Sequence, residues 1–286
     1  MPSASKIAVT GATGRVGRHV VDVLAARRHD VVSISRSSGV DVVTGEGLAE
    51  ALAGVETVID AATQPSPDQE AATTFFQASA HNLQELGLLA GVRRIVMVSI
   101  VGADRFTGGF LAGKAAHERA LLAGPVPVRI LRATQFHEFV PQMVEWGTQG
   151  EVVYVPKIRT QLVAARSVAE ALVELAEGSQ PARKAADGAR FPELGGLREE
   201  RLVDVARLLV ARRGETLRVE EVVNPDDLDH ELYANGALLP GPGAVLAGPT
   251  FENWLDGDTS IQRRTTREVR PADLSRRDAG AGRKAA

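Results

Sequence analysis

Three glycines at a fixed spacing are the residues of this chain with the clearest chemical meaning. Residues 9–17 read V-T-G-A-T-G-R-V-G, so Gly11, Gly14 and Gly17 follow a short apolar run and precede a helix-like pattern. In such a turn the first glycine makes the tight bend, the second lets the backbone approach a pyrophosphate, and the third lets the helix pack closely. The free N–H groups at the helix start then hold the phosphates. This spacing, one residue longer in its first gap than the usual fingerprint, predicts a dinucleotide site that includes Thr13, Arg15 and Val16.

The end of the next apolar run indicates which dinucleotide is bound. Residues 33–38 read S-I-S-R-S-S, and the first carboxylate after them is Asp41. An acidic residue at this place binds the ribose hydroxyls of NAD, whereas an arginine accommodates the 2′-phosphate of NADP. Arg36 offers a planar fork of donors, and Ser35 and Ser37 add hydroxyl groups. The sequence therefore predicts NADP(H) as the cofactor, with a surface arginine in a polar turn as the alternative interpretation.

Alternating strand-like and helix-like segments must position these groups. This alternation is typical of the α/β class and predicts a Rossmann-type, doubly wound parallel sheet. Strands are predicted at residues 6–10, 31–35, 40–43, 56–62, 94–99 and 128–132. Helices are predicted after Gly17 and at residues 46–53, 68–90 and 111–122, the third with Phe75, Ala78, Leu83, Leu86 and Leu89 facing inward and Gly91 ending it.

The second half of the chain has a less regular pattern, which predicts a smaller substrate-binding region. Helices are expected at residues 139–146, 167–177, 199–212 and 250–255, and strands at 152–155, 161–163 and 218–223, with a wrapping loop over 238–249. We expect residues 1–134 to form the NADP-binding Rossmann domain, to which 157–177 return. Residues 135–156 and 178–257 then form the substrate-binding region, and the charged tail 258–286 is expected to be disordered.

Composition excludes several functional classes. The chain of 286 residues has no cysteine, so disulfides, thiolate metal sites and a catalytic thiol are ruled out. Its net charge of −3 gives no general attraction for nucleic acid. We find no pair of histidines with metal-ligand spacing, no signal peptide and no apolar run as long as a membrane span. The expectation is a cytoplasmic monomer or homodimer that acts on a small molecule, without a membrane or nucleic-acid partner.

Several motifs, in order along the chain, resemble one family. Besides residues 10–17 and 35–38, they are V-S-I-V-G-A-D at 98–104, G-K-A-A-H-E-R-A-L at 113–121 and L-R-A-T-Q-F-H-E-F at 131–139. Together they resemble the atypical short-chain dehydrogenases/reductases of the NmrA-like branch, which are related to isoflavone reductases. The resemblance implies a site at the carboxyl ends of the strands, as the rule for open α/β sheets also requires. It places Ala61, Ala62 and Thr63 along the adenosine ribose and phosphates, Ser99 near the nicotinamide ribose, and Thr134 to Phe136 near the nicotinamide ring.

The chain departs from this family at its usual proton donor. Many short-chain reductases carry a tyrosine four residues before a lysine, and here Phe110 precedes Lys114. A phenylalanine neither donates nor accepts a proton. The resemblance still implies that Lys114 binds the nicotinamide ribose and supplies positive charge. His137 is the first candidate for a replacement acid, because imidazole titrates in the useful range; a structural histidine is the alternative. Tyr154 and Asp104 are further candidates.

Three functions fit this pattern. The first is an NADPH-dependent reductase of a small, mostly apolar carbonyl, quinone or conjugated substrate, for which orientation over the cofactor does most of the work. Its substrate pocket would be lined by the apolar residues Phe106, Phe110, Phe136, Phe139, Met143 and Trp146. The second is a non-catalytic, NADP-binding redox sensor that regulates a partner, which the loss of the tyrosine favours. The third is a non-redox enzyme that keeps the cofactor as a structural element.

Overall fold

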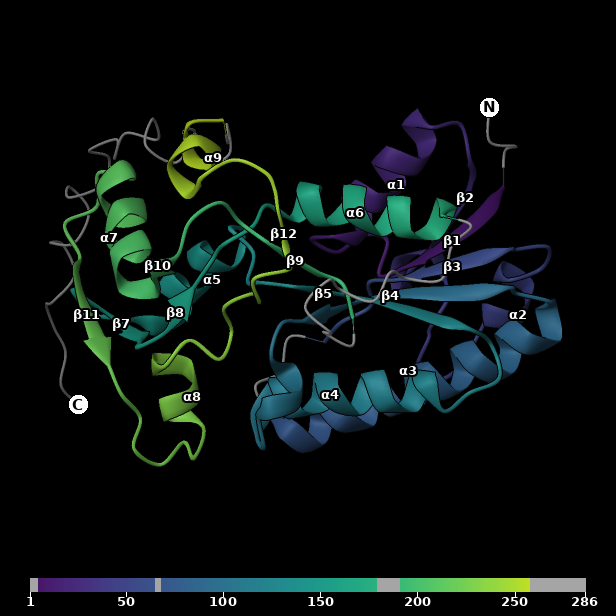
Figure 1. Ribbon diagram of the computed structural model, residues 1–286, viewed down its shortest axis with the longest axis horizontal. Coiled ribbons are helices and arrows are strands. Elements are labelled where there is room, and N and C mark those ends of the chain that lie inside the picture. The colour runs from purple at the N-terminus through teal and green to yellow at the C-terminus, as the bar shows by residue number, and fades with distance from the viewer. Residues whose placement is uncertain (1–4, 65–67, 179–190, 258–286) are drawn as a thin grey trace, which may run out of the picture.

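A seven-stranded parallel sheet forms the centre of the larger lobe (Figure 1). The structure is a computed structural model that describes residues 5–64, 68–178 and 191–257. Along the sheet the strand order is β12-β9-β5-β4-β3-β1-β2, so β2 lies on one side of β1 and β3 lies on the other, with later strands added outward from β3. The strands are β1 (Lys6–Thr10), β2 (Asp30–Ile34), β3 (Thr57–Asp60), β4 (Arg94–Ile100), β5 (Val128–Ala133), β9 (Glu193–Gly195) and β12 (Val245–Leu246).

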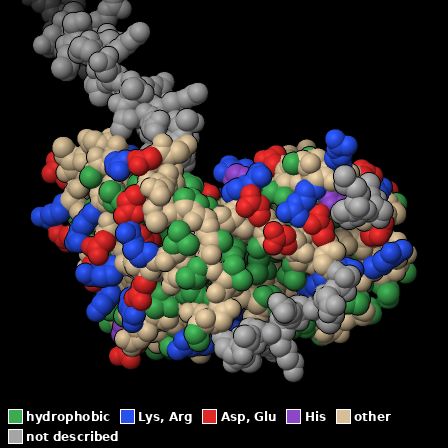
Figure 2. All heavy atoms as spheres, turned by 45° about the horizontal axis from the view of Figure 1, so that its top comes forward, with side chains coloured by type: hydrophobic (Ala, Val, Ile, Leu, Met, Phe, Trp, Pro, Cys, Tyr) green, Lys and Arg blue, Asp and Glu red, His purple; other side chains and the backbone are tan. Residues whose placement is uncertain are grey.

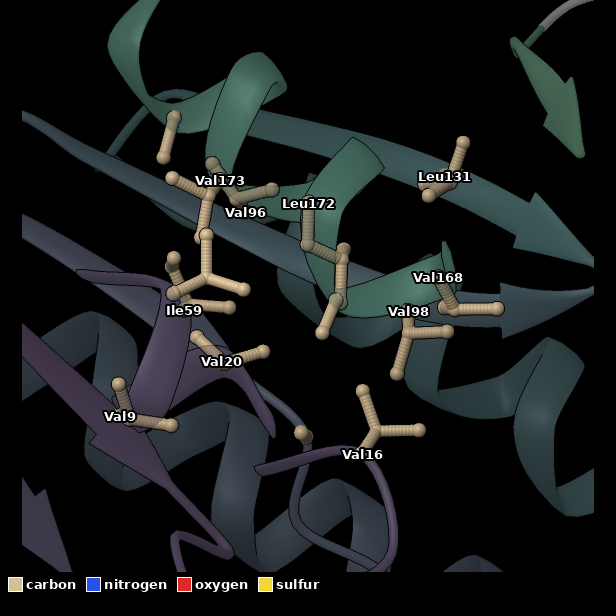
Figure 3. Close-up of a cluster of buried hydrophobic side chains, with 14 of the residues drawn as sticks. Val9, Val16, Val20, Ile59, Val96, Val98, Leu131, Val168, Leu172 and Val173 are labelled. Atoms are coloured by element: carbon tan, nitrogen blue, oxygen red, sulfur yellow. The ribbon is translucent and has the colours of Figure 1, made fainter. Parts of the chain in front are cut away.

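Helices cover both faces of this sheet, which confirms the Rossmann-type prediction. Helices α1 (Gly17–Ala26) and α6 (Ala165–Glu177) lie on one face, and α2 (Leu48–Ala51), α3 (Gln69–Ala90) and α4 (Gly109–Leu122) lie on the other (Figure 1). Because side chains alternate along a buried strand, Val9 and Val98 point to the α1/α6 face, while Ala8 and Met97 point to the α3/α4 face. Figure 3 shows Val20 of α1 and Leu172 of α6 meeting over the first of these faces.

The second lobe is built from short elements around its own apolar core. Its helices are α5 (Phe139–Gly147), α7 (Leu202–Arg212), α8 (His230–Ala234) and α9 (Phe251–Gly257), and its strands are β6 (Thr148–Gln149), β7 (Val152–Pro156), β8 (Arg159–Thr160), β10 (Glu200–Arg201) and β11 (Arg218–Val222). Val140 and Val144 of α5 pack with Leu209 of α7 and Phe251 of α9. Since β5 leads directly into α5, the carboxyl end of the sheet faces this lobe.

Several predicted element positions are wrong. The expected strand over 40–43 is absent because Asp41 folds the chain back: its carboxylate accepts hydrogen bonds from the N–H groups of Val43 (2.7 Å) and Thr44 (3.3 Å). In the segment 161–163 only Val163 bridges to Phe136, and the nearby strand is β8. The predicted wrapping loop 238–249 contributes β12, a strand at the edge of the sheet.

The buried face of α3 also differs from the predicted one. Leu89 is 77 % exposed, whereas Ala72, Phe76 and Ala80 are buried with Leu83. The sequence places apolar residues on adjacent stripes of this helix, and contact with α4 selects one of them. Gly91 ends the helix in the left-handed conformation, as predicted.

Two further expectations concern the ends of the chain and the membrane. The predicted disordered tail, residues 258–286, lies outside the described residues. Within the described part of the chain, no helix has the length and apolar character of a membrane span.

Candidate functional site

The glycine loop joins β1 to α1 with almost no free space around its backbone. Gly11 has a φ of +63°, and a Cβ added there would lie 2.6 Å from the carbonyl oxygen of Ala61. A Cβ added at Gly17 would lie only 2.0 Å from the carbonyl oxygen of Gly11. Gly14 closes the turn by donating its N–H to that same oxygen at 2.8 Å. Only glycine fits the first and third positions, which matches the tight turn and close helix packing that the spacing predicts.

A cavity of about 1020 Å³ opens beside this loop. Eight predicted cofactor residues line it, namely Gly11, Thr13, Gly14, Ser35, Arg36, Ala61, Ala62 and Thr63. Among the described residues no side chain caps the start of α1, although the N–H of Arg18 already donates to the Gly14 carbonyl at 3.2 Å. The cradle, the helix start and the size of the cavity fit a dinucleotide.

Arg36 stands at the rim of the cavity. It opens a short 3₁₀ turn (Arg36–Ser38), in which the Ser38 hydroxyl donates to the Ser35 carbonyl at 2.7 Å. Its side chain is exposed, and within the described part of the chain no carboxylate pairs with it. Asp41 also lines the cavity, but its carboxylate already accepts two backbone N–H groups. Among the described residues that line the cavity, Arg36 is the only cationic side chain, and a guanidinium is a strong donor to phosphate oxygens.

Lys114 is buried in a polar cluster next to this cavity. Its Nζ lies 3.4 Å from Nδ1 of His117, and Nε2 of His117 lies 3.1 Å from Oδ2 of Asp60. The other oxygen of Asp60 accepts hydrogen bonds from the Thr10 hydroxyl (2.5 Å) and the Ala62 N–H (3.1 Å). The cluster thus runs from the end of β1, beside the glycine loop, to the lysine on α4.

Burial and mutual charge set the protonation of this cluster. Burial lowers the pKa of Lys114 to about 8, against the opposing effect of the Asp60 and Glu118 carboxylates. Burial lowers the pKa of His117 as well, and the Lys114 ammonium adds to that effect. Burial by itself would raise the pKa of Asp60, but His117 and Lys114 bring it down to about 2. At neutral pH the cluster is an ammonium and a carboxylate separated by a neutral imidazole.

Two acidic groups hold α4 in place. Near its start, the buried Asp229 accepts hydrogen bonds from the N–H groups of Thr107 (2.8 Å) and Gly108 (2.9 Å). One turn after Lys114, Glu118 forms a bidentate pair with Arg132 of β5, at 2.9 and 2.7 Å. Arg132 also reaches Asp104 at 3.0 Å. Helix α4, which carries Lys114, is therefore held to the sheet through Glu118 and to the second lobe through Asp229.

Comparison with known proteins places the chain in a family. The model of an NAD(P)H-binding family matches residues 11–178, more than half of the chain. The chain belongs to this NAD(P)H-binding family. Its cofactor is of the NAD(P)(H) class, which agrees with the glycine loop and the cavity. The expected membership of an NAD(P)-binding family is confirmed.

Individual relatives of this NAD(P)H-binding protein show how far the similarity reaches. An L-arabinose 1-dehydrogenase (NAD(P)(+)) of Haloferax volcanii is 35 % identical over 105 residues, which cover 33 % of this chain and only 41 % of that relative. MoeE5 in complex with UDP-glucuronic acid and NAD has a similar structure, with a TM-score of 0.66 at 17 % identity over 91 % of this chain and 100 % of that one. A UDP-N-acetylglucosamine 4-epimerase from Bacillus cereus gives 0.62 at 16 % identity, over 91 % and 97 %. The two structures share the fold.

Other predicted residues of this NAD(P)H-binding protein lie outside the cavity wall. Val16 directly precedes α1 and Gly17 begins it, both buried, and Ser99 is buried on β4. The remaining positions have these partners: Arg15 donates to Gln142 at 2.7 Å, Ser37 lies 2.9 Å from the Ser35 hydroxyl, Thr134 donates to the Gln161 carbonyl at 2.6 Å, and Phe136 bridges to Val163. The structure therefore separates the predicted residues that line the cavity from those that do not.

His137 lies apart from the Lys114 cluster. It is fully buried, with ring centroids 5.5 Å from both Phe251 and Trp254 of α9, and its Nε2 lies 3.0 Å from the Pro249 carbonyl. Because a carbonyl only accepts, Nε2 carries the proton. Burial lowers the pKa of His137 to about 4, against weaker opposing effects of Pro249 and Glu252. These contacts favour the structural interpretation of His137.

The neutral state of His137 leads to a pH prediction. Its pKa is about 4 when folded and near 6.5 when unfolded. Between these values the unfolded chain binds a proton that the folded chain excludes, so stability falls as the pH falls. His137→Gln keeps a donor for Pro249 but cannot titrate. From about pH 7.5 to about pH 4.5, urea unfolding should show the variant losing about 2–3 kcal/mol less stability than the unaltered protein. Equal losses would mean that the imidazole is charged in the folded protein.

Sequence reasoning missed the residues that connect these parts. Asp60, Thr10 and Phe76 are not among the predicted site residues, and His117 enters the sequence analysis only as part of the motif at 113–121. The ring of Phe76 stacks on His117 at 4.7 Å, with the Lys114 ammonium 4.5 Å from its centroid. The available signal was a carboxylate, Asp60, at the end of a buried strand. Among the described residues, no group of three or more histidine and carboxylate side chains is arranged to hold a metal ion.

Proposed function

We propose that the chain is an NADPH-dependent reductase of a small, mostly apolar carbonyl, quinone or conjugated substrate. The observation that carries this proposal is the exposed Arg36 in the wall of the glycine-loop cavity, with which no carboxylate of the described residues forms an ion pair. When bound, NADPH supplies the hydride. We assign cofactor binding to residues 1–134 and 157–177, and substrate binding to residues 135–156 together with the described part of 178–257.

The chain's own residues have distinct parts in this proposal. The N–H groups at the start of α1 bind the pyrophosphate, and Arg36 with Ser35 and Ser37 binds the 2′-phosphate. Lys114 supplies positive charge toward the substrate oxygen, which gains negative charge as the hydride arrives. Such a charge is most effective in a buried setting like that of Lys114, where little water competes with it.

The position of the usual tyrosine restricts the substrate class. Phe110 packs edge-on against Phe76, with ring centroids 5.6 Å apart, and has no proton to give. A simple ketone reduced at this site needs a proton at its oxygen, whereas a quinone or an enone can take up its proton from water after hydride transfer. This favours an electron-poor, conjugated substrate.

Apolar surface at the junction of the lobes supports the same class. Phe110, Phe136 and Phe139 are half-buried, and Trp146, which contacts Phe139, is 56 % exposed. Figure 2 shows hydrophobic side chains gathered on the face between the two lobes. A flat, apolar molecule fits such a surface better than a sugar does.

A panel of acceptors tests the proposal. NADPH oxidation should exceed background with at least one quinone or enone and should be slower with aliphatic aldehydes. L-arabinose with NADP⁺ is the matched reverse assay, because the Haloferax relative carries that activity in its name. Tight NADPH binding combined with background oxidation across the panel would overturn the reductase. Turnover of L-arabinose alone would overturn the apolar substrate class.

Phe110 also favours a second candidate, a non-catalytic redox sensor that binds NADP(H). A sensor must bind the oxidised and reduced cofactors with different affinities, because a ligand shifts an equilibrium only through differential binding. In that case calorimetry would give Kd values for NADP⁺ and NADPH that differ by about tenfold or more, without turnover in the acceptor panel. Similar Kd values would exclude the sensor.

Replacing Arg36 tests the cofactor preference. In Arg36→Ala the 2′-phosphate loses a charge-assisted, two-donor partner, so NADPH affinity should fall by about 10- to 100-fold. NADH affinity should change less than about threefold, since NADH has no phosphate there. Calorimetric titration with both cofactors measures the difference. Arg93→Ala is the control, because Arg93 precedes β4 at the opposite end of the sheet. Equal losses for NADPH and NADH would refute the assignment of Arg36.

A further inference from the structure

A row of polar side chains lies buried beneath α3 and α4. Thr10 and Asp60 end the strands β1 and β3, Ser99 is the last residue but one of the neighbouring β4, and each is at most 1 % exposed. They follow Ala8, Val58 and Met97 by two positions, so all three point to the sheet face that α3 and α4 cover. His117 and Lys114 of α4 reach down to the same place. Polar groups in such a position need partners, because solvent is excluded.

The contacts fix which nitrogen of His117 carries a proton. An ammonium only donates, so His117 Nδ1, 3.4 Å from Lys114 Nζ, must be the bare, accepting nitrogen. The proton then sits on Nε2, 3.1 Å from the ionised Asp60 carboxylate. The opposite tautomer would set an N–H against the ammonium and a lone pair against the carboxylate. The Nε2–H tautomer alone sets a donor against the carboxylate and an acceptor against the ammonium; the Nε2–Oδ2 contact at 3.1 Å is close but lacks the alignment of a full hydrogen bond.

We propose that Asp60 and His117 are positioning residues for Lys114. Asp60 selects the Nε2–H tautomer of His117, and the bare Nδ1 holds the Lys114 ammonium in its charged form at the end of the sheet. The inference rests on the proposed role of Lys114 beside the cofactor. It assigns a function to two residues that lie behind the cavity wall and are not expected to touch the cofactor or the substrate.

The surroundings of the cluster support this assignment. The groups that face Lys114 are Asp60 of β3, His117 and Glu118 of α4, and the ring of Phe76 of α3. Glu118 is already paired with Arg132, so Asp60 is the carboxylate left to balance the ammonium. The Phe76 ring stacks on His117 and keeps the imidazole in the plane that joins its two partners. Among the groups that face it, Nδ1 of His117 is therefore the main hydrogen-bond acceptor for the Lys114 ammonium.

The same carboxylate also orders the cofactor cavity. Oδ1 of Asp60 binds the hydroxyl of Thr10, the residue before Gly11, and the N–H of Ala62, which lines the cavity. Asp60 therefore couples the cavity wall to the tautomer of His117. A change at His117 should reach NADPH binding through the charge of Lys114.

The first test reads the tautomer directly. ¹⁵N NMR of the imidazoles in the full chain, with the His117 signals assigned by their loss in His117→Asn, should show neutral Nε2–H and bare Nδ1. The state should persist from about pH 6 to about pH 8, because burial and the Lys114 ammonium lower the pKa of His117. An Nδ1–H tautomer or a charged imidazole in this range would overturn the inference.

The second test uses two variants of His117, each of which keeps a polar group at the position of only one of the two imidazole nitrogens. In His117→Asn a side-chain oxygen replaces Nδ1 and can still accept from Lys114, whereas His117→Gln places its polar group toward Asp60 and gives Lys114 no acceptor. NADPH affinity at about pH 7 should fall less than about threefold in the asparagine variant and about tenfold or more in the glutamine variant. The pH at which NADPH affinity declines should drop in the glutamine variant alone.

A merely structural role for His117 gives a different pattern. Both variants would then lose thermal stability and NADPH affinity together, with no change in the pH profile, and that outcome would overturn the inference. A third variant, Lys114→Met, distinguishes failure of this inference from failure of the proposed function. Unchanged NADPH affinity in Lys114→Met, with the expected His117 tautomer in the unaltered protein, would refute the role of Lys114 at the cofactor. A wrong tautomer would refute the positioning pair itself.

Discussion

Gly17→Ala should remove tight NADPH binding and lower the stability of the fold. The new Cβ would lie 2.0 Å from the oxygen and 2.7 Å from the carbon of the Gly11 carbonyl. Both atoms belong to the backbone, so no side chain can turn aside, and α1 must move away from the loop. Overpacking of this kind costs about 1–3 kcal/mol in urea unfolding. Two or more N–H contacts to the pyrophosphate are lost with the shift, which lowers NADPH affinity by about 100-fold or more.

The control for this prediction is another glycine-to-alanine change. Gly257 ends α9, and apart from its own helix and chain neighbours no heavy atom of the described residues lies within 4 Å of an added Cβ, so Gly257→Ala should leave both stability and NADPH affinity nearly unchanged. NADPH binding by Gly17→Ala with the affinity of the unaltered protein would mean that the start of α1 does not hold the phosphates.

The parts of the site that depend on local sequence could be predicted. Gly11, Gly14 and Gly17 have their roles because of backbone conformation and close approach, which spacing alone reveals. The parallel sheet could also be predicted from local sequence, since each buried strand is a short apolar run that alternates with a helix-like segment. The strand predicted over 40–43 is wrong because so short a segment has a sequence pattern that suits a strand and a turn equally well. The turn is decided by the Asp41 carboxylate, which accepts a hydrogen bond from the N–H of Val43.

The parts that depend on contacts between distant segments could not be predicted. Asp60 and His117 are far apart in the sequence, and only the packing of α4 over the end of β3 brings them within 3.1 Å. His137 is suited by residue type to proton transfer, but Phe251 and Trp254 of the last described helix bury its ring. A sequence shows which side chains can titrate; the surrounding elements decide whether they do.

Removing Arg132 should be the most destabilising single change in the α4 region. Glu118 is buried and forms two short hydrogen bonds to this guanidinium. In Arg132→Met the buried Glu118 carboxylate loses its guanidinium partner, and loss of one member of a buried pair costs about 3–5 kcal/mol. Urea unfolding should show this loss. NADPH affinity should fall as well, because Glu118 fixes the helix turn that carries Lys114.

Two controls identify the buried charge as the cause. The exposed pair Arg166–Glu170, with both side chains 47 % exposed, is the matched surface case, and Arg166→Ala should cost less than about 1 kcal/mol. The double variant Arg132→Met with Glu118→Leu removes both charges and should recover much of the lost stability, since an apolar pair of similar volume replaces a buried ion pair at little cost. If the double variant were as unstable as Arg132→Met, the loss would come from packing around Arg132, including its contact with Phe191, and the charge of Glu118 would not be its cause.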